Sequence, residues 1–297
     1  RVNEGKVRRL GSTTVEQTMA SSVSACIGGF LALGGQVTTN SSACTTGTEA
    51  IVEAFHKIRE GRATRILAGG AEGSSHYIWA GFDAMRVLAR NWNDCPDAAS
   101  RPMSASAGGF VPSSGAGLLM LESLTSARKR GARIYAEVLG GHVNCGGQRG
   151  GGSMTAPNPE GARRCILAAL DVAGIGAGEI EAINGHLTAT MADTLEVGTW
   201  QRALGRKPDA FPWINSTKSL IGHGLGAAGG VEAVAVVLQI SRGFVHGSLN
   251  CDDLHPDLAA FAGCIPHQTI DVAPRVVAKA SFGFGDVNGC AIFARHE

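Results

Sequence analysis

The sequence is poor in charge and has no closely spaced cysteine pairs. Charged residues make up 17% of the 297 residues, and the formal net charge is +1. This balance argues against a dedicated nucleic-acid-binding protein, because such domains are strongly basic. None of the eight cysteines forms a CxxC pair, so no metal site is expected. Their scatter along a chain of this length predicts reduced thiols and a cytoplasmic enzyme.

Long apolar segments are also missing from the sequence. No signal peptide opens it, and the longest expected apolar helix, residues 227–240, contains Glu232 and is shorter than a membrane span. We therefore expect no membrane partner. The first nine residues are polar and basic, and no strand-like run precedes the helical pattern from Thr13. On this ground the chain is expected to begin inside a domain.

Apolar residues (44%) and glycine (42 residues) are abundant, which predicts a folded core with many tight turns and close backbone contacts. Helical spacing follows Cys44 and recurs in Val231–Leu238, and the second helix is apolar almost all round. The glycine-rich segment 140–152 is predicted to be a mobile surface loop. Strand-length apolar runs surround the two helices and predict an α/β protein. These runs are Arg65–Ala68, Gly117–Leu121, Ile134–Leu139, Ile180–Ile183, Val276–Ala280 and Cys290–Phe293.

A run of small residues ends at Cys44, which opens the first of these helices. A thiol at a helix N-terminus lies at the positive end of the helix dipole, which favours the thiolate and suits a nucleophile. A buried structural cysteine explains the segment equally well.

Three further segments carry groups that can take part in chemistry. His186 follows an apolar strand and precedes Thr188 and Thr190, although most single histidines are structural. Lys218 and His223 lie five residues apart in a Gly/Ser-rich turn, which could equally be an ordinary turn. The segment 280–286 places two phenylalanines between glycines, which would let a backbone N–H approach a ligand, or would form a common β-turn.

Taken in order, these motifs resemble the elongating β-ketoacyl-[acyl carrier protein] synthases of types I and II. The motifs are the cysteine, Asn-x-His-x-Thr-x-Thr, Ser-Thr-Lys-Ser-x-x-Gly-His and Ser-Phe-Gly-Phe-Gly. The resemblance extends from about Thr13 to the C-terminus. It implies a thiolase-like α/β fold of five α-β-α-β-α layers in two similar halves, with the first part of the N-terminal half absent. Residues 1–127 would carry the nucleophile and residues 128–297 the two histidines.

The resemblance also implies the chemistry. Cys44 would take an acyl group from the phosphopantetheine arm of an acyl carrier protein. His186 and His223 would then assist the decarboxylation of malonyl-carrier protein, and the resulting carbanion would attack the thioester on Cys44. Lys218 would orient the histidines, and the backbone N–H groups of Cys44 and Phe284 would form an oxyanion hole. No metal or redox cofactor is implied.

Other roles follow from the same resemblance. Glu196, three residues beyond Asp193, would pair with the lysine of the site. Thr188 and Thr190 would touch the phosphopantetheine arm. Phe284 would act as a gate beside the nucleophile.

The implied partner is an acidic acyl carrier protein. Lys6, Arg8 and Arg9 are candidate docking residues, but a solvated basic loop explains them as well. The family dimerises through the strand before the nucleophile, here residues 36–41. A homodimer is expected, and a heterodimer with a chain-length factor remains open.

Two positions depart from the family pattern near the expected acyl site. Leu187 and Asp286 stand where glycine is usual, which leads to the hypothesis of a specialised synthase of polyene or other secondary-metabolite assembly. The main alternative is a non-catalytic chain-length factor, which usually lacks the nucleophilic cysteine. A cysteine–histidine hydrolase of the same acyl substrates is a third reading.

Overall fold

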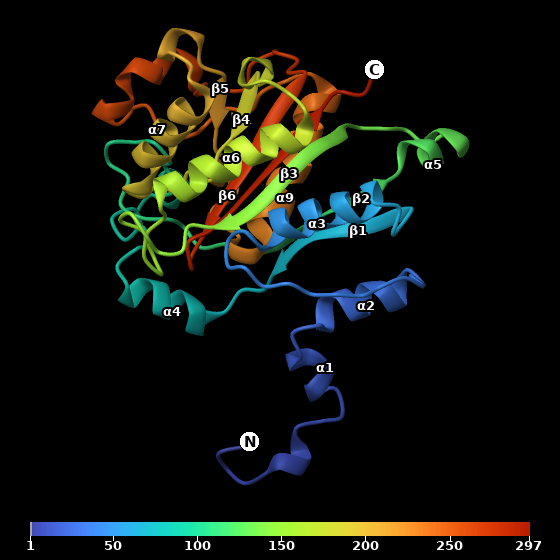
Figure 1. Ribbon diagram of the computed structural model, residues 1–297. Helices are drawn as coiled ribbons and strands as arrows, with labels where there is room; N and C mark the ends of the chain where they lie inside the picture. Colours follow the sequence, from blue (N-terminus) through green and yellow to red (C-terminus); the bar gives the residue numbers. More distant parts are fainter. Residues whose placement is uncertain (1) are drawn as a thin grey trace. The chain divides into compact units, whose positions relative to one another are not determined.

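The computed structural model describes residues 2–297, and the chain divides into two compact units between Ser41 and Ser42 (Figure 1). The N-terminal unit contains a 3-10 helix, Val7–Arg9, and the short helices α1 (Thr14–Thr18) and α2 (Ser22–Phe30). In α2, the Ser24 hydroxyl lies 2.6 Å from that of Thr39. The helical start expected near Thr13 is confirmed. Residues 36–41 do not form a strand, so the strand expected before the nucleophile is not present in this unit.

The larger unit contains two β-sheets. Strands β1 (Arg65–Glu72) and β2 (Gly115–Glu122) form an antiparallel pair. The second sheet has five strands in the order β3-β7-β6-β4-β5, in which β4 runs parallel to both of its neighbours. Its strands are β3 (Glu137–Cys145), β4 (Ala182–Asn184), β5 (Trp213–Asn215), β6 (Val276–Gly283) and β7 (Val287–Ala294). The predicted α/β class is confirmed.

Helices α3 (Thr46–Arg59) and α9 (Ala228–Arg242) lie between the two sheets and pack against each other (Figure 1). Helix α6 (Pro159–Ala173) covers the other face of the five-stranded sheet, and α7 (Ala192–Leu204) packs beside it. The unit thus shows four successive layers. The short helices are α4 (His76–Ala84), α5 (Leu124–Lys129) and α8 (Lys218–Ile221).

Glycines set how closely α3 and α9 approach. A Cβ atom at Gly47 would lie 2.4 Å from the backbone nitrogen of Gly230, so no side chain fits there. The backbones of the two helices can therefore touch near their N-termini. Because Cys44 precedes α3 and His223 precedes α9, this contact brings the two side chains to the same place.

The glycine-rich segment 140–152 differs from its prediction. Residues Gly140–Cys145 are part of β3 and not of a loop. A Cβ at Gly140 would lie 2.5 Å from the nitrogen of Ala173, and one at Gly141 would lie 2.6 Å from the side chain of Val52. The glycines let helices α6 and α3 pack tightly against the strand.

One helical stretch, Leu225–Arg242, is long and apolar enough to cross a membrane, which corrects the expectation that it is too short. It includes α9, and 56% of it is buried inside the unit. Packing between the two sheets explains its apolar composition.

Candidate active site

Cys44 occupies a tight turn immediately before α3. Ala43 adopts a left-handed backbone conformation (φ 49°), and Thr45 donates a hydrogen bond of 3.0 Å to the carbonyl of Val287 in β7. A positive φ is unfavourable for alanine and marks a sharply turned backbone. The turn presents the buried Sγ atom to the space between the helix N-termini.

The thiol of Cys44 is not activated as the sequence predicted. Burial raises its pKa to about 11, while the positive charge of Lys218 and the backbone N–H groups of Phe284 and Cys44 lower it. Desolvation of the charged form therefore outweighs the helix dipole, and the resting group is a thiol. The backbone N–H groups of Phe284 and Cys44 are close enough to the sulphur to lower its pKa.

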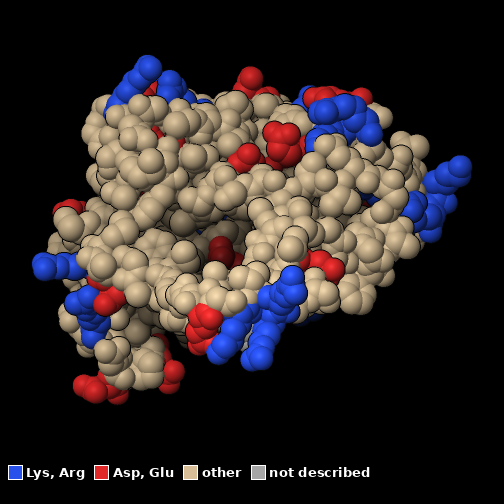
Figure 2. Space-filling model, turned by 90° about the horizontal axis from the view of Figure 1, so that it is seen from below, with Lys and Arg blue, Asp and Glu red and all other residues tan. Residues whose placement is uncertain are grey.

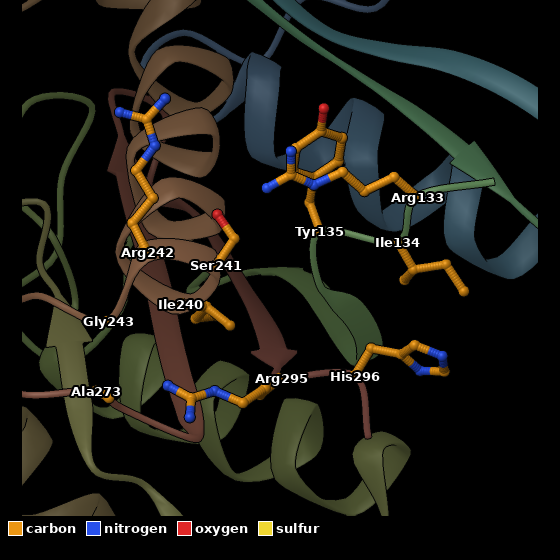
Figure 3. Close-up of a pocket in the computed structure, with 10 residues that line it drawn as sticks. All are labelled: Arg133, Ile134, Tyr135, Ile240, Ser241, Arg242, Gly243, Ala273, Arg295 and His296. Carbon is orange, nitrogen blue, oxygen red and sulfur yellow. The ribbon is translucent and has the colours of Figure 1, made fainter.

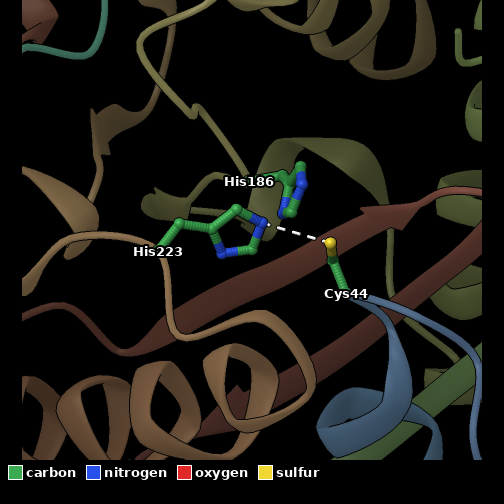
Figure 4. A group of neighbouring side chains, drawn as sticks. All are labelled: Cys44, His186 and His223. Atoms are coloured by element: carbon green, nitrogen blue, oxygen red, sulfur yellow. Dashed lines mark hydrogen bonds between the residues drawn. The ribbon is translucent and has the colours of Figure 1, made fainter. Parts of the chain in front are cut away.

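His223 is fixed at both its backbone and its ring. Its N–H donates to the carbonyl of Val111 at 2.7 Å, and its carbonyl accepts from Ser113 at 3.0 Å. The ring Nδ1 accepts the N–H of Leu225 at 3.2 Å, so a neutral ring carries its proton on Nε2. That Nε2 lies 3.1 Å from Cys44 Sγ (Figure 4). Desolvation and then Lys218 lower the pKa of His223 well below 6.5, which keeps the ring neutral.

His186 is held by its backbone and leaves its ring free. The N–H groups of His186 and Leu187 donate to the two carboxylate oxygens of Glu196, at 2.7 and 2.8 Å. The ring stands edge-on to that of His223 with centroids 5.2 Å apart (Figure 4), and its buried Nδ1 has no partner among residues 2–297. Desolvation, followed by Lys218, lowers its pKa well below the ordinary value. A buried imidazole without a partner is suited to receive a ligand.

Two acids of α7 orient the loop that carries His186. Asp193 accepts the N–H groups of Thr188 and Ala189 at 2.8 and 3.1 Å, and also that of Met103 at 2.8 Å. The hydroxyls of Thr188 and Thr190 lie 3.0 Å apart at this turn. Burial raises the pKa of Glu196 to about 7 despite its two backbone N–H donors.

The pairing expected between Lys218 and Glu196 is wrong. The ammonium group of Lys218 instead contacts Glu232 of α9, and both side chains are at most 2% exposed. The two oxygens of Glu196 instead accept the backbone N–H groups of His186 and Leu187. The other oxygen of Glu232 lies 2.6 Å from Lys279 of β6. Glu232 and Lys279 were missed, although a charge inside an apolar helix or strand was a visible signal.

Phe284 follows β6 and lies in a row of aromatic rings. Its ring lies edge-on to that of Phe82 in α4, with ring centroids 6.0 Å apart. The centroids of Phe82 and Phe110, and those of Phe110 and His223, are each 5.2 Å apart, also edge-on. The row connects the expected gate to one of the two histidines.

The sequence of the chain matches a family that is described by two domains. The description "Beta-ketoacyl synthase, N-terminal domain" fits residues 2–127, and "Beta-ketoacyl synthase, C-terminal domain" fits residues 135–252. The 3-oxoacyl-[acyl-carrier-protein] synthase 1 of Haemophilus influenzae is 38% identical over 98% of this chain and 69% of its own length. The chain belongs to the β-ketoacyl synthase family.

Further members of the β-ketoacyl synthase family are similar at comparable levels. The 3-oxoacyl-[acyl-carrier-protein] synthase 2 of Rhizobium meliloti is 42% identical over 86% of this chain, which spans only 60% of that protein. Among solved structures, a β-ketoacyl synthase from Burkholderia phymatum superposes with a TM-score of 0.91 at 32% identity. The ishigamide ketosynthase/chain length factor superposes at 0.89 with 30% identity. Each of these two matches covers 100% of this chain and 70% of the solved chain.

A third solved structure is that of a type II polyketide synthase acyl-carrier protein in complex with its ketosynthase bound to the hexaketide. Its TM-score is 0.89 at 30% identity, and the match covers 97% of this chain and 70% of the other.

Two departures from the β-ketoacyl synthase pattern have structural explanations. Leu187 is 1% exposed and belongs to the main core cluster, so its side chain fills core space. Asp286, with φ 61°, accepts the N–H groups of Gln148 and Asn158 at 2.8 and 2.9 Å. It ties the loop that follows β3 to the Phe284 turn.

Two other features of this β-ketoacyl synthase chain bear on binding. The ligand-type atoms of Cys44, His186 and His223 all lie within 4.8 Å of one another, a spacing that a metal ion could also use. A separate cavity of about 430 Å³ is lined by none of these three residues (Figure 3). Its lining residues include Arg133, Arg242 and Arg295.

On the face shown in Figure 2, acidic and basic side chains form small groups around a mostly uncharged surface.

Proposed function

We propose that this chain provides the catalytic residues of a β-ketoacyl-[acyl carrier protein] synthase. The observation that carries the proposal is the geometry at the sulphur. Cys44 Sγ lies 3.1 Å from a neutral imidazole that is fixed as a donor, and a second buried imidazole beside it has no partner at Nδ1. Two ring donors and one nucleophile suit a decarboxylative condensation better than a cysteine–histidine hydrolysis, which needs a basic imidazole.

In the first step, Cys44 exchanges with the acyl thioester of a carrier's phosphopantetheine arm. The sulphur forms a bond to the acyl carbon, the carrier's sulphur leaves, and the thiol proton passes to that leaving group. His223 does not serve as the base, because its Nε2 already holds a proton; it donates to the sulphur as negative charge develops. The backbone N–H groups of Cys44 and Phe284 stabilise the tetrahedral oxyanion.

In the second step, malonyl-carrier protein loses CO₂ and leaves an enolate. The imidazoles of His186 and His223 donate to the enolate oxygen, since both rings are neutral. The carbanion attacks the acyl carbon on Cys44, and the expelled sulphur takes a proton from solvent. The product is a β-ketoacyl thioester two carbons longer than the acyl group.

The other residues predicted from the sequence have roles in the same proposal. Thr188 and Thr190 contact the phosphopantetheine arm, Phe284 gates the acyl site, and Lys218 supplies positive charge. Asp193 and Glu196 hold the His186 loop. The chain takes part in fatty-acid or polyketide biosynthesis, uses no cofactor of its own beyond the carrier's arm, and acts in the cytoplasm.

The proposal extends to architecture and partners. The four layers seen here form part of a five-layer thiolase-like fold with two similar halves, divided at residues 127 and 128. Exposed Leu118 and Met120 on β2 mark the face where a further layer would pack. The working unit docks an acidic acyl carrier protein and forms a homodimer, or a heterodimer with a chain-length factor. A related ketosynthase is known in complex with its acyl-carrier protein.

The alternative is a chain-length-factor-like partner subunit. The likeness to the ishigamide ketosynthase/chain length factor keeps this reading open. The retained Cys44 and both histidines favour the catalytic role.

The deciding experiment incubates the full-length protein with acyl-carrier and malonyl-carrier proteins and records intact masses. We expect an acyl adduct on Cys44 and a product extended by two carbons, both absent from Cys44→Ala. Free acid in place of the extended product would indicate a hydrolase. A wild type that matches the mutant in every readout would indicate a chain-length factor.

A further inference from the structure

Lys279 is a buried lysine that the proposed mechanism does not use. It lies in β6, is 0% exposed, and pairs in register with Asn184 of β4 and Ala291 of β7. Its ammonium group contacts the carbonyl of Ala280 and lies 2.9 Å from the hydroxyl of Ser281. It also lies 2.6 Å from one carboxylate oxygen of Glu232. A fully buried ammonium group is costly unless it is paired, so this position needs an explanation.

The charge balance of the cluster formed by Lys218, Glu232 and Lys279 supplies an explanation. Lys218 contacts one oxygen of Glu232, and Lys279 contacts the other. Lys218 and Glu232 alone would form a neutral pair. With the second lysine, two ammonium groups share one carboxylate, so the ionised cluster keeps one positive charge in excess. All three side chains are at most 2% exposed, and solvent therefore screens that charge only weakly.

The cluster lies within electrostatic reach of the reacting groups. After desolvation, the positive charges of Lys218 and Lys279 are among the causes that hold the pKa of both His186 and His223 below the ordinary value. Burial lowers the pKa of Lys279, and Glu232 of α9 is the main group that opposes this shift and favours the charged form. Lys218 of α8 lowers the same pKa and Glu196 of α7 raises it. On the neighbouring strand β7, the buried Cys290 also senses Lys279.

A hydrogen-bonded path also leads from Lys279 to the helix that follows the nucleophile. The hydroxyl of Ser281 accepts a hydrogen bond from Lys279. The same hydroxyl lies 2.8 Å from the hydroxyl of Thr48 in the first turn of α3. Lys279 therefore connects the Glu232 cluster of α9 with the Cys44 side of the site.

We propose that Lys279 is a positioning residue that neutralises Glu232, so that the positive charge of Lys218 remains uncompensated beside the two histidines. This inference rests on the proposed function and deepens it. Negative charge develops at the histidine pair when CO₂ leaves, and a net cationic cluster favours that charge. The same excess charge disfavours protonation of the imidazoles, which leaves Nδ1 of His223 able to accept the Leu225 N–H and keeps the ring in its fixed orientation.

The kinetic test uses Lys279→Met in the full-length protein, because methionine matches the length of the side chain and removes its charge. We expect kcat for condensation to fall about tenfold, with KM for both carriers within about twofold. Glu196 sets an acid limb of its own near pH 7, so the pH–rate profiles are compared in a Glu196→Gln background. There the limb set by the histidines moves to higher pH in Lys279→Met, since the histidines become easier to protonate. Lys279→Arg, which keeps the charge, retains the wild-type limb. A Lys279→Met enzyme with wild-type kcat and pH profile would overturn the proposal.

A second substitution separates charge from packing. Glu232→Gln added to Lys279→Met removes the carboxylate and restores one positive charge on Lys218. We expect this double variant to recover the position of the acid limb. A limb that stays displaced, with thermal melting showing both variants folded, would mean that Lys279 acts only through packing.

A third measurement does not depend on ketosynthase activity. The full-length wild type and the variants are labelled with ¹⁵N-histidine, and the rings of His186 and His223 are titrated by NMR. Their protonation is expected at higher pH in Lys279→Met and at the wild-type position in the double variant. If the wild type fails to condense substrates, the proposed function fails, but this titration still supports or refutes the role of Lys279. Equal titrations in wild type and Lys279→Met would refute it.

Discussion

The two histidines of the site are held in opposite ways. The turn after β4 fixes His186 through backbone N–H groups that donate to Glu196, and leaves the ring Nδ1 without a partner. The turn that precedes α9 fixes His223 through its ring, whose Nδ1 accepts the Leu225 N–H and whose Nε2 faces Cys44. Strands β4 and β5 are parallel neighbours, so the two turns leave the same edge of the sheet.

The difference indicates a division of labour. A ring that is already bonded to the sulphur can act in both acyl transfer and condensation. A ring that is held only through its backbone has its polar atoms available for the second substrate. Because the pKa of both imidazoles is lowered, the rings are weak bases, and the site suits donation of hydrogen bonds better than removal of protons.

Removing the bonded ring should have the largest effect. His223→Ala is expected to lower both the rate of Cys44 acylation and the rate of condensation, the latter by roughly a thousandfold. Intact-mass kinetics of the adduct and product formation measure the two steps separately. Wild-type acylation in this variant would show that the 3.1 Å contact with Sγ has no role in the first step.

Removing the unbonded ring should affect one step only. His186→Ala is expected to slow malonyl decarboxylation by roughly a hundredfold, because one donor to the enolate is lost. Acylation of Cys44 should stay within a few-fold of wild type. A variant that loses both steps equally would abolish the distinction between the two histidines.

The acid that anchors His186 should give this site a dependence on pH. Glu196 has its pKa raised to about 7, so its ionised form, which accepts two N–H bonds, predominates only above that pH. Activity should therefore fall as the pH drops through about 7. Glu196→Gln, which cannot ionise, should lose about tenfold in kcat at high pH and lack this limb.

The same shift has the opposite effect on stability. Because the folded pKa lies above the ordinary 4.5, the folded protein binds the proton more tightly than the unfolded chain does. This contribution to stability is complete below about pH 4.5 and is lost as the pH rises through 7. Denaturant titrations at pH 5 and 8 should show the free energy of unfolding of the wild type fall relative to that of Glu196→Gln at the higher pH. An unchanged difference would contradict the raised pKa.

The smallest catalytic effect is expected one residue beyond His186. Leu187→Ala removes a side chain from the main core cluster and should lower the free energy of unfolding by roughly 2–5 kcal/mol. Its effect on kcat should be under about threefold, since the N–H bond to Glu196 is made by the backbone. Leu204→Ala, in the same cluster, is the control for core loss alone. A large change in product length in the Leu187 variant, absent from the control, would place Leu187 at the acyl site after all.

The nucleophile and both histidines could be predicted because each lies in a local motif. Each follows a strand or opens a helix, and the order of the motifs is specific. The partner of Lys218 could not be predicted in this way. Glu232 lies in the second turn of α9 and Lys279 lies in β6, so only packing brings the three together.

Two further errors have the same origin in packing. The thiol of Cys44 was expected to favour the thiolate from its place at a helix start, but its burial dominates and burial depends on the whole fold. Gly140–Cys145 was expected to be a loop because of its glycines, whereas those glycines allow α6 and α3 to pack on a strand. Composition alone does not separate glycine used for flexibility from glycine used for close contact.

The row of rings from Phe284 through Phe82 and Phe110 to His223 also has a practical consequence. If an acyl chain moves Phe284 as proposed, the edge contacts of Phe82 and Phe110 offer a route by which the movement reaches the imidazole of His223. Because aromatic rings alter the magnetic field around them, the ¹H resonances of His223 should sense whether the acyl site is occupied. The protein thus contains its own spectroscopic reporter of loading, which needs no attached probe.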